Sequence, residues 1–202
     1  SGDFAKLREE ELESEMAGLW LSEIEPQLPG RESLRILDVG TGSGFFAVLL
    51  AEKGHHVTGI DLTPAMIEEA GRLAAERQVE VDFRVMDAEK LECEDGQFEA
   101  VVSRNLTWTL PHPEQAYREW LRVLRPGGVL LNFDADYGME RFAVEDCLPE
   151  NHAHRQMSCS QLEECDAIKD ELAISRMRRP LWDVETLGKL NCRQTETDTG
   201  VS

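Results

Sequence analysis

The 202-residue sequence contains no run of 18 or more apolar residues, the length that a membrane-spanning helix requires. Its first 15 residues are rich in glutamate, whereas a signal peptide begins with positive charge. We therefore expect a cytoplasmic protein that does not associate with a membrane.

Basic residues are also scarce. The chain has 21 Lys and Arg against 40 Asp and Glu, which gives a formal net charge of −19 at pH 7 and a pI near 4.6. Such a surface repels nucleic-acid phosphates and anionic lipid headgroups. The composition therefore argues against nucleic acid as a partner.

The five cysteines are odd in number, scattered, and include no C-x-x-C pair. This pattern supports neither a disulfide framework nor a zinc site. His152 and His154 could in principle bind a metal together with Cys159, but no neighbouring residue has a familiar ligand spacing. We interpret the two histidines as polar residues of a loop or helix start, and we expect no metal.

The most informative segment, residues 36–46, reads Ile-Leu-Asp-Val-Gly-Thr-Gly-Ser-Gly-Phe-Phe. An apolar strand runs into a turn with three glycines, and an apolar helix follows. Glycines at 40, 42 and 44 permit positive φ and let a ligand approach the backbone closely. In open α/β sheets, such a turn at the carboxyl end of a strand binds ligands.

The spacing of this turn differs from the dinucleotide fingerprint G-x-G-x-x-G. A pyrophosphate requires free backbone amides with no anion nearby. Here Asp38 precedes Gly40 by two residues. A carboxylate at this position suits a ligand that carries an ammonium group.

Strands and helices alternate along the first two thirds of the chain, which predicts parallel strands joined by right-handed crossovers. The predicted fold class is therefore α/β, a Rossmann-like, doubly wound, mostly parallel sheet with helices on both faces. Charged residues alternate with apolar ones over residues 79–85, so this strand is expected near a sheet edge. The predicted strands are 34–39, 57–60, 79–85, 98–103 and 129–133, with helices from Gly44, Pro64 and Glu114 and a turn at 125–128.

We expect a single domain. Residues 1–30 form an N-terminal helical cap, in which Leu7, Leu12, Met16, Leu19 and Trp20 recur at helical intervals. Residues 34–134 form the sheet, residues 135–180 an inserted helical lid, and residues 181–202 a C-terminal helix and one polar strand. The lid is expected to pack through Leu162, Ile168, Leu172 and Met177.

The seven residues from Asp38 to Gly44 match D/E-x-G-x-G-x-G, and here the sequence resembles the class I S-adenosylmethionine (SAM)-dependent methyltransferases. Four further segments agree in order and spacing. They contain Asp61, Asp87, the stretch from Ser103 to Leu110, and Leu-x-Pro-Gly-Gly at 124–128. Together the matches cover residues 34–134. The stretch after the fourth strand resembles the small-molecule branch often called type 11, with Trp108 in place of a more usual histidine.

The resemblance implies SAM as cofactor and S-adenosylhomocysteine as product. Asp61, 17 residues after Gly44, would accept hydrogen bonds from both ribose hydroxyls, while Leu62 lines the adenine. Asp87 and the Ala88 amide would read the adenine edge, and Arg104 would pair with the methionine carboxylate. Met66 belongs either to the adenine site or to the core. The expected cofactor-binding residues are Asp38, Gly40, Thr41, Gly42, Gly44, Asp61, Leu62, Met66, Asp87, Ala88, Arg104 and Asn105.

Two features depart from the family. The usual sixth and seventh strands are not both present, so the sheet edge is incomplete or closed by another chain, for example in a homodimer. The second departure is that no motif fixes a general base.

The roles of several other residues stay open. Trp108 either forms part of the acceptor wall, covers the sulfonium or is a packing residue. Arg178, Arg179 and Trp182 either hold an anionic acceptor or anchor the lid. Candidate bases are His112, Asp136, Tyr137, His152 and His154.

Three functions fit these observations. The first is methyl transfer from SAM to a small-molecule acceptor by direct displacement, in which proximity and desolvation supply the catalysis. The second is a non-catalytic SAM-binding domain or partner subunit. The third is an NAD(P)-dependent oxidoreductase, against which the glycine spacing, Asp38 and Asp87 all argue.

Overall fold

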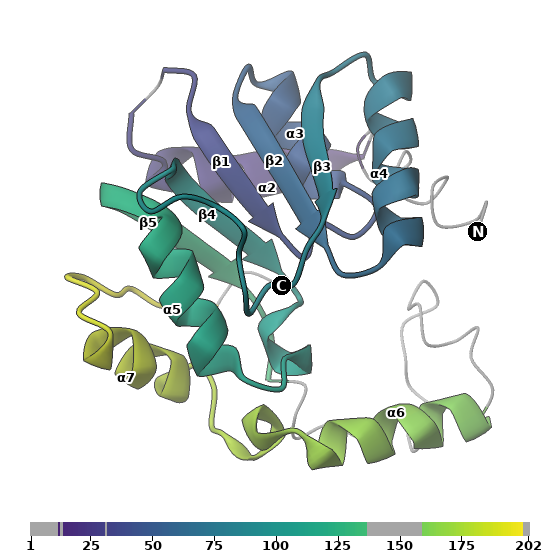
Figure 1. Ribbon diagram of the computed structural model, residues 1–202, viewed down its shortest axis with the longest axis vertical. Coiled ribbons are helices and arrows are strands. Elements are labelled where there is room, and N and C mark those ends of the chain that lie inside the picture. The colour runs from purple at the N-terminus through teal and green to yellow at the C-terminus, as the bar shows by residue number, and fades with distance from the viewer. Residues whose placement is uncertain (1–11, 13, 31, 137–158, 200–202) are drawn as a thin grey trace. The chain divides into compact units, whose positions relative to one another are not determined.

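The computed structural model describes residues 12, 14–30, 32–136 and 159–199 (Figure 1). The chain divides into two compact units. The first comprises residues 1–106 and 115–133, and the second comprises residues 107–114 and 134–202. The first unit contains the sheet.

The sheet has five parallel strands in the order β3-β2-β1-β4-β5. The strand order reverses between β1 and β4, the place where doubly wound sheets bind ligands. The predicted parallel α/β fold is confirmed, as is the edge position of β3. The strands are β1 (Arg35–Val39), β2 (His56–Asp61), β3 (Val81–Val85), β4 (Phe98–Arg104) and β5 (Leu124–Phe133).

Helices cover both faces of the sheet. In Figure 1, α2 (Glu15–Ile24) and α3 (Phe45–Glu52) lie behind the strands, and α5 (Pro113–Val123) lies in front of β4 and β5. Helix α4 (Pro64–Glu76) contacts β2 and β3 as well as α3. The core includes almost every side chain of α3, because this apolar helix packs between the sheet and its neighbouring helices.

The N-terminal segment packs through only part of the predicted apolar face, since Leu12 is buried and Trp20 packs against the core as expected. Ala17 and Ile24 are buried, and Trp20 and Leu21 pack against the core, whereas Met16 and Leu19 are 40% and 57% exposed. The prediction was wrong for Met16 and Leu19, because the buried stripe follows the 17, 20, 21, 24 spacing. Leu7 lies outside the described residues.

Residues 125–128 do not form a separate turn before β5. The strand begins at Leu124, and its pairing with β4 shifts register between Phe98 and Ala100. Gly127 has φ +82°, and a Cβ on Gly128 would lie 2.9 Å from the Glu99 carbonyl oxygen. The two glycines therefore accommodate an irregularity inside the strand.

The second unit contains helical segments: η2 (Thr107–Thr109), α6 (Cys159–Glu171), η6 (Ala173–Arg176) and α7 (Leu181–Lys189). Helix α6 was predicted to pack through Ile168, but Ile168 is 57% exposed. The neighbouring Lys169 is buried and pairs with Asp166 at 3.0 Å. An ion pair therefore occupies the buried side of α6, where apolar spacing had predicted Ile168.

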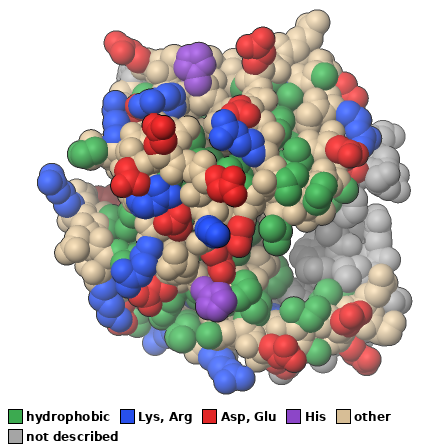
Figure 2. Space-filling model, in the orientation of Figure 1, with side chains coloured by type: hydrophobic (Ala, Val, Ile, Leu, Met, Phe, Trp, Pro, Cys, Tyr) green, Lys and Arg blue, Asp and Glu red, His purple; other side chains and the backbone are tan. Residues whose placement is uncertain are grey.

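The polar strand expected at 193–201 is absent over residues 193–199, the part of it that the structure describes. The sheet in the described ranges accordingly ends at β5. Those ranges also contain no helix with the length and apolarity to span a membrane. Acidic and basic side chains are interspersed on the face shown in Figure 2.

Candidate functional site

The three glycines of the turn between β1 and α3 all have left-handed backbones. Gly40, Gly42 and Gly44 have φ of +70°, +54° and +93°. The Thr41 amide donates to the Ile60 carbonyl at 2.8 Å, which joins the turn to β2. Glycine is favoured at each position because other residues rarely adopt this conformation.

The three glycines differ in the space around them. A Cβ on Gly40 would lie 2.8 Å from the Leu106 side chain, and one on Gly44 would lie 2.9 Å from the Ala70 Cβ. A Cβ on Gly42 would meet nothing within 4 Å. Gly40 and Gly44 thus serve close packing, whereas Gly42 borders open space in which a ligand can lie against the backbone.

Asp61, the last residue of β2, braces the turn. Its Oδ2 accepts from the Gly42 amide at 3.0 Å, and its Oδ1 accepts from the Thr63 amide at 2.8 Å. Thr63 occupies the N-cap of α4, but its side chain makes no capping bond. Each carboxylate oxygen can accept a second hydrogen bond, so the bracing leaves capacity for ligand hydroxyls.

Asp38 is buried, with 2% of its surface exposed, and its Oδ2 accepts from the Thr41 hydroxyl at 2.6 Å. Burial raises its pKa to about 7, while the Thr41 hydroxyl, the Ala47 backbone and the Arg104 charge oppose the rise. The buried carboxyl group is therefore bonded to the glycine turn through Thr41, and its pKa lies near neutral pH.

Two predicted adenine-lining residues follow Asp61. Leu62 is 69% exposed, which is unusual for a large apolar side chain, and Met66 is half-buried in the first turn of α4. Exposed apolar surface beside an open glycine turn can cover a flat aromatic ligand.

Asp87 and Ala88 begin the loop after β3. The Met86 amide donates to the Asp61 carbonyl at 3.0 Å, so this loop starts beside the end of β2. The exposed Asp87 accepts from the Glu89 amide at 2.8 Å. The Ala88 carbonyl accepts from the Trp120 indole at 3.0 Å. The structure thus brings Asp87, Ala88 and Asp61 to one edge of the sheet.

Three residues of α5 fix this loop, and the sequence pattern does not single them out. Besides Trp120, Arg122 donates to the Cys93 and Leu91 carbonyls at 2.8 and 2.9 Å. Glu119 pairs with Arg122 and accepts from the Leu91 amide at 3.0 Å. Hydrogen bonds to Glu119 and Asp95 raise the pKa of Arg122. In the sequence, these residues look like the ordinary charged and apolar faces of a helix.

Arg104 ends β4 and lies against aromatic rings. Its guanidinium carbon is 4.7 Å from the Trp20 ring centroid, 5.3 Å from that of Phe45 and 5.6 Å from that of Phe46. Asn105 follows with φ +53°, and its amide donates to the Phe133 carbonyl at 2.8 Å. Trp20 was expected only as a packing residue.

In the second unit, Arg179 pairs with Asp134 and Asp183, each at 2.9 Å. Asp134 also accepts from the Trp108 amide at 3.1 Å. Burial raises the pKa of Asp134, against the effect of Arg179. Of the two interpretations of Arg179, these contacts favour anchoring over holding an acceptor.

The candidate bases remain unassigned. His112 is exposed and Asp136 half-buried, and Tyr137, His152 and His154 lie outside the described residues. Over the described ranges, no group of three or more His, Cys, Asp or Glu side chains could hold a metal ion.

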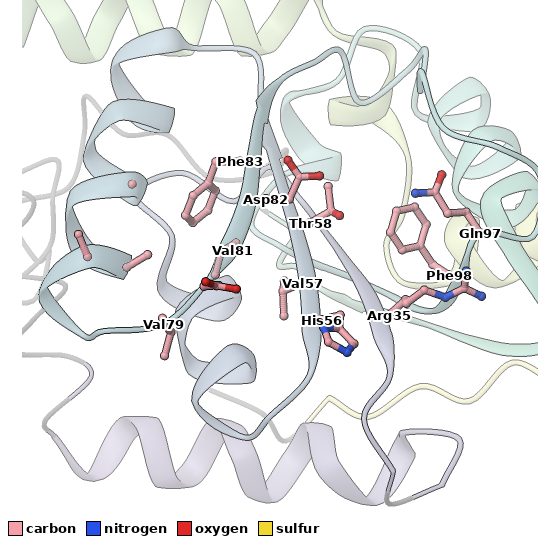
Figure 3. Close-up of a pocket in the computed structure, with 14 residues that line it drawn as sticks. Arg35, His56, Val57, Thr58, Val79, Val81, Asp82, Phe83, Gln97 and Phe98 are labelled. Carbon is pink, nitrogen blue, oxygen red and sulfur yellow. The ribbon is translucent and has the colours of Figure 1, made fainter.

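A hollow of about 690 Å³ lies at the other end of the sheet (Figure 3). Its lining includes Arg35, His56 and Phe98, the first residues of β1, β2 and β4. Ligands of doubly wound folds bind at the carboxyl ends of the strands instead. The hollow is therefore separate from the glycine turn.

Comparison with known proteins agrees with this geometry. Residues 37–132 match the family model described as a methyltransferase domain. A putative methyltransferase, YqeM of Bacillus subtilis (strain 168), is 33% identical over 176 residues, which are 85% of this chain and 68% of YqeM. The chain therefore belongs to the class I SAM-dependent methyltransferases, whose cofactor is SAM.

Two other relatives share less of the chain. The ubiquinone biosynthesis O-methyltransferase of Xanthomonas oryzae pv. oryzae (strain PXO99A) is 39% identical over 97 residues, 48% of this chain and 41% of that protein. The chain thus spans less than half the length of this curated relative. The crystal structure of the PH0226 protein from Pyrococcus horikoshii OT3 has 31% identity and a TM-score of 0.55. The match covers 62% of this chain and 57% of the PH0226 chain.

Proposed function

We propose that the protein transfers a methyl group from SAM to a small-molecule acceptor by direct displacement. The observation that carries the proposal is the edge formed by Gly42 and Asp61, where an open backbone surface lies beside a carboxylate with free acceptor capacity. A nucleoside can lie on the glycine while its ribose hydroxyls reach the carboxylate.

The described residues fit this cofactor. Asp61 would bind the ribose, Leu62 and Met66 would cover the adenine, and Asp87 with the Ala88 amide would read its edge. Arg104 and the backbone at Asn105 would hold the methionine end, near the carboxylate of Asp38. The turn residues Gly40, Thr41, Gly42 and Gly44 would shape the surface beneath it.

When bound, SAM supplies a methyl group already activated by the positive sulfonium. The chain then has to hold donor and acceptor in line and exclude water, which accounts for much of the acceleration in such displacements. An acceptor that must lose a proton would also need a general base. None of the described residues is assigned that role.

The acceptor is proposed to be a small molecule. The net charge of −19 disfavours nucleic acid, and one relative is named as a ubiquinone biosynthesis O-methyltransferase. We propose that residues 135–180 shape the acceptor pocket, because they follow β5 directly, at the carboxyl edge of the sheet. We also propose that the chain is a single domain, that the protein is cytoplasmic, and that it forms a homodimer.

Calorimetry with SAM, S-adenosylhomocysteine and NAD tests cofactor choice. We expect binding of the first two and none of NAD. Tight NAD binding without SAM binding would overturn the proposal in favour of an oxidoreductase. Methyl transfer to a panel of hydroxyl, amine and thiol metabolites then tests catalysis, because a SAM-binding partner subunit would bind the cofactor and leave every acceptor unchanged.

A further inference from the structure

We propose that Trp20 of α2 is a positioning residue, which orients Arg104 toward the carboxylate of the cofactor's methionine moiety. The proposal rests on the proposed function and adds a residue to its cofactor site. It follows from the position of Arg104 in the sheet, from the rings around its guanidinium, and from the surroundings of the indole itself.

The backbone of Arg104 lies beside the glycine turn. In the β1–β4 pairing, Ser103 is opposite Val39, so Arg104 comes level with Gly40, the first residue of the turn. A side chain that starts there can reach the end of a ligand lying along the turn. The positive charge of Arg104 also lowers the pKa of Asp38, which precedes the same turn, and this agrees with the strand pairing.

The guanidinium is held by rings from two helices. Phe45 and Phe46 begin α3, immediately after Gly44, while Trp20 comes from α2 and gives the shortest ring distance, 4.7 Å. Aromatic faces attract a guanidinium without using its N–H groups, which point outward in the plane of the fork. Stacking through the guanidinium faces therefore restricts the orientation of Arg104 and does not itself use the N–H groups by which an arginine pairs with a planar carboxylate.

Trp20 is itself fixed in place. Its ring makes edge contacts with Phe46 at 5.2 Å and with Phe133 at 5.1 Å between centroids. Its indole nitrogen is buried and has no hydrogen-bond acceptor within the described part of the chain. A buried donor is costly when it lacks an acceptor, so this cluster favours a ligand that brings acceptor oxygens to it.

The test compares SAM with decarboxylated SAM, which differs from it only by the carboxylate. For the wild-type protein, calorimetry should show that SAM binds at least about tenfold more tightly, as expected for a charge-assisted pair. Trp20→Leu should reduce this ratio to about threefold or less, while the affinity for decarboxylated SAM changes by less than about threefold. Arg104→Gln should reduce the ratio as strongly.

Two further variants separate stacking from general packing. Trp20→Phe keeps a ring face beneath Arg104 and should give a ratio between those of the wild type and Trp20→Leu. Leu19→Ala changes an exposed residue of the same helix and should leave both affinities unaltered. Thermal unfolding of each variant establishes that the protein is folded at the temperature of the titration.

Equal losses of affinity for both ligands in Trp20→Leu would show a purely structural role and overturn the proposal. So would a Trp20→Phe ratio as low as that of Trp20→Leu, or a wild-type protein that binds both ligands equally well. The last result would leave the proposed function intact. Failure of the wild-type protein to bind either ligand would instead contradict the proposed function itself.

Discussion

The backbone amide of Gly42 donates a hydrogen bond to the carboxylate of Asp61, with Gly42 N and Asp61 Oδ2 3.0 Å apart. This bond joins the turn after β1 to the end of β2. The carboxylate expected to hold the ribose therefore also sets the shape of the surface on which the nucleoside would lie. Binding and local stability are coupled at this residue.

Asp61→Ala should weaken SAM binding by roughly 1.5 to 3 kcal/mol, the scale for losing hydrogen bonds to a charged group. It should also lower the free energy of unfolding by about 1 kcal/mol, because the Gly42 and Thr63 amides lose their acceptor. Calorimetry and urea denaturation measure the two effects.

Asp82→Ala is the matched control, since Asp82 is an exposed carboxylate on β3 that pairs with Arg84. It should change SAM affinity by less than about twofold, as is usual for an exposed pair. An unchanged affinity in Asp61→Ala would remove Asp61 from the ribose site.

Gly42→Val should abolish SAM binding while the protein still folds. The new side chain enters open space, where the ligand would lie, and the strain of φ +54° costs about 1 to 3 kcal/mol. Gly44→Ala should mainly reduce stability instead, because its Cβ would lie 2.9 Å from Ala70. Wild-type SAM affinity in Gly42→Val, measured by calorimetry, would contradict the placement of the ligand.

Much of the sheet could be predicted from the sequence because each strand and turn carries a local signal. Apolar runs mark the buried strands, alternation marks β3 as an edge, and Gly40, Gly42 and Gly44 have the positive φ that only glycine adopts readily. These features depend on backbone sterics and burial, which act over a few residues.

The contacts that organise the site are not local, and the sequence does not reveal them. Trp120 and Arg122 bind a loop about 30 residues away in the chain, and Trp20 meets Arg104 across 84 positions. The prediction of how α6 packs was wrong for a related reason. Its apolar residues are sparse, and the buried Asp166–Lys169 pair overrides the spacing that favoured Ile168.

Asp38 should make stability depend on pH. Its pKa is about 7 in the folded protein and near 3.8 when unfolded, so the folded state binds the proton more tightly. The free energy of unfolding should therefore fall as the pH rises from about 4 to 7, by up to about 1.4 kcal/mol per pH unit. The variant Asp38→Asn serves as the reference, because its side-chain amide does not titrate and its oxygen can still accept the hydrogen bond from the Thr41 hydroxyl.

The measurement is urea denaturation of the wild-type protein and Asp38→Asn at several pH values. The variant should gain stability relative to the wild type through this window, and the difference should level off above about pH 7. A difference that stays constant from pH 4 to 7 would show that Asp38 is ionised throughout.

Arg179→Leu should destabilise the second unit by roughly 3 to 5 kcal/mol, the scale for removing one partner of a buried ion pair. The Arg179 side chain is 6% exposed, and its loss leaves Asp134 and Asp183 buried without their cation. Arg178→Leu, at an exposed neighbouring position, is the control and should change stability little. Urea denaturation followed by tryptophan fluorescence reports the effect, and equal stability of the two variants would refute an anchoring role for Arg179.

Residues 159–176 should exchange their amide hydrogens quickly in the free protein and slowly when SAM and an acceptor are both bound. They belong to the segment proposed to shape the acceptor pocket, and α6 buries an ion pair while Ile168 stays exposed. Elements with few buried apolar contacts open at low free energy. The strands β1 and β2, buried at the centre of the sheet, should stay protected in both states and provide the internal control.

Hydrogen exchange with mass spectrometry resolves the two regions. Strong protection of 159–176 in the free protein would mean that this segment is rigid scaffold or a contact between subunits, and the acceptor site would then have to be sought beside Trp20 on α2.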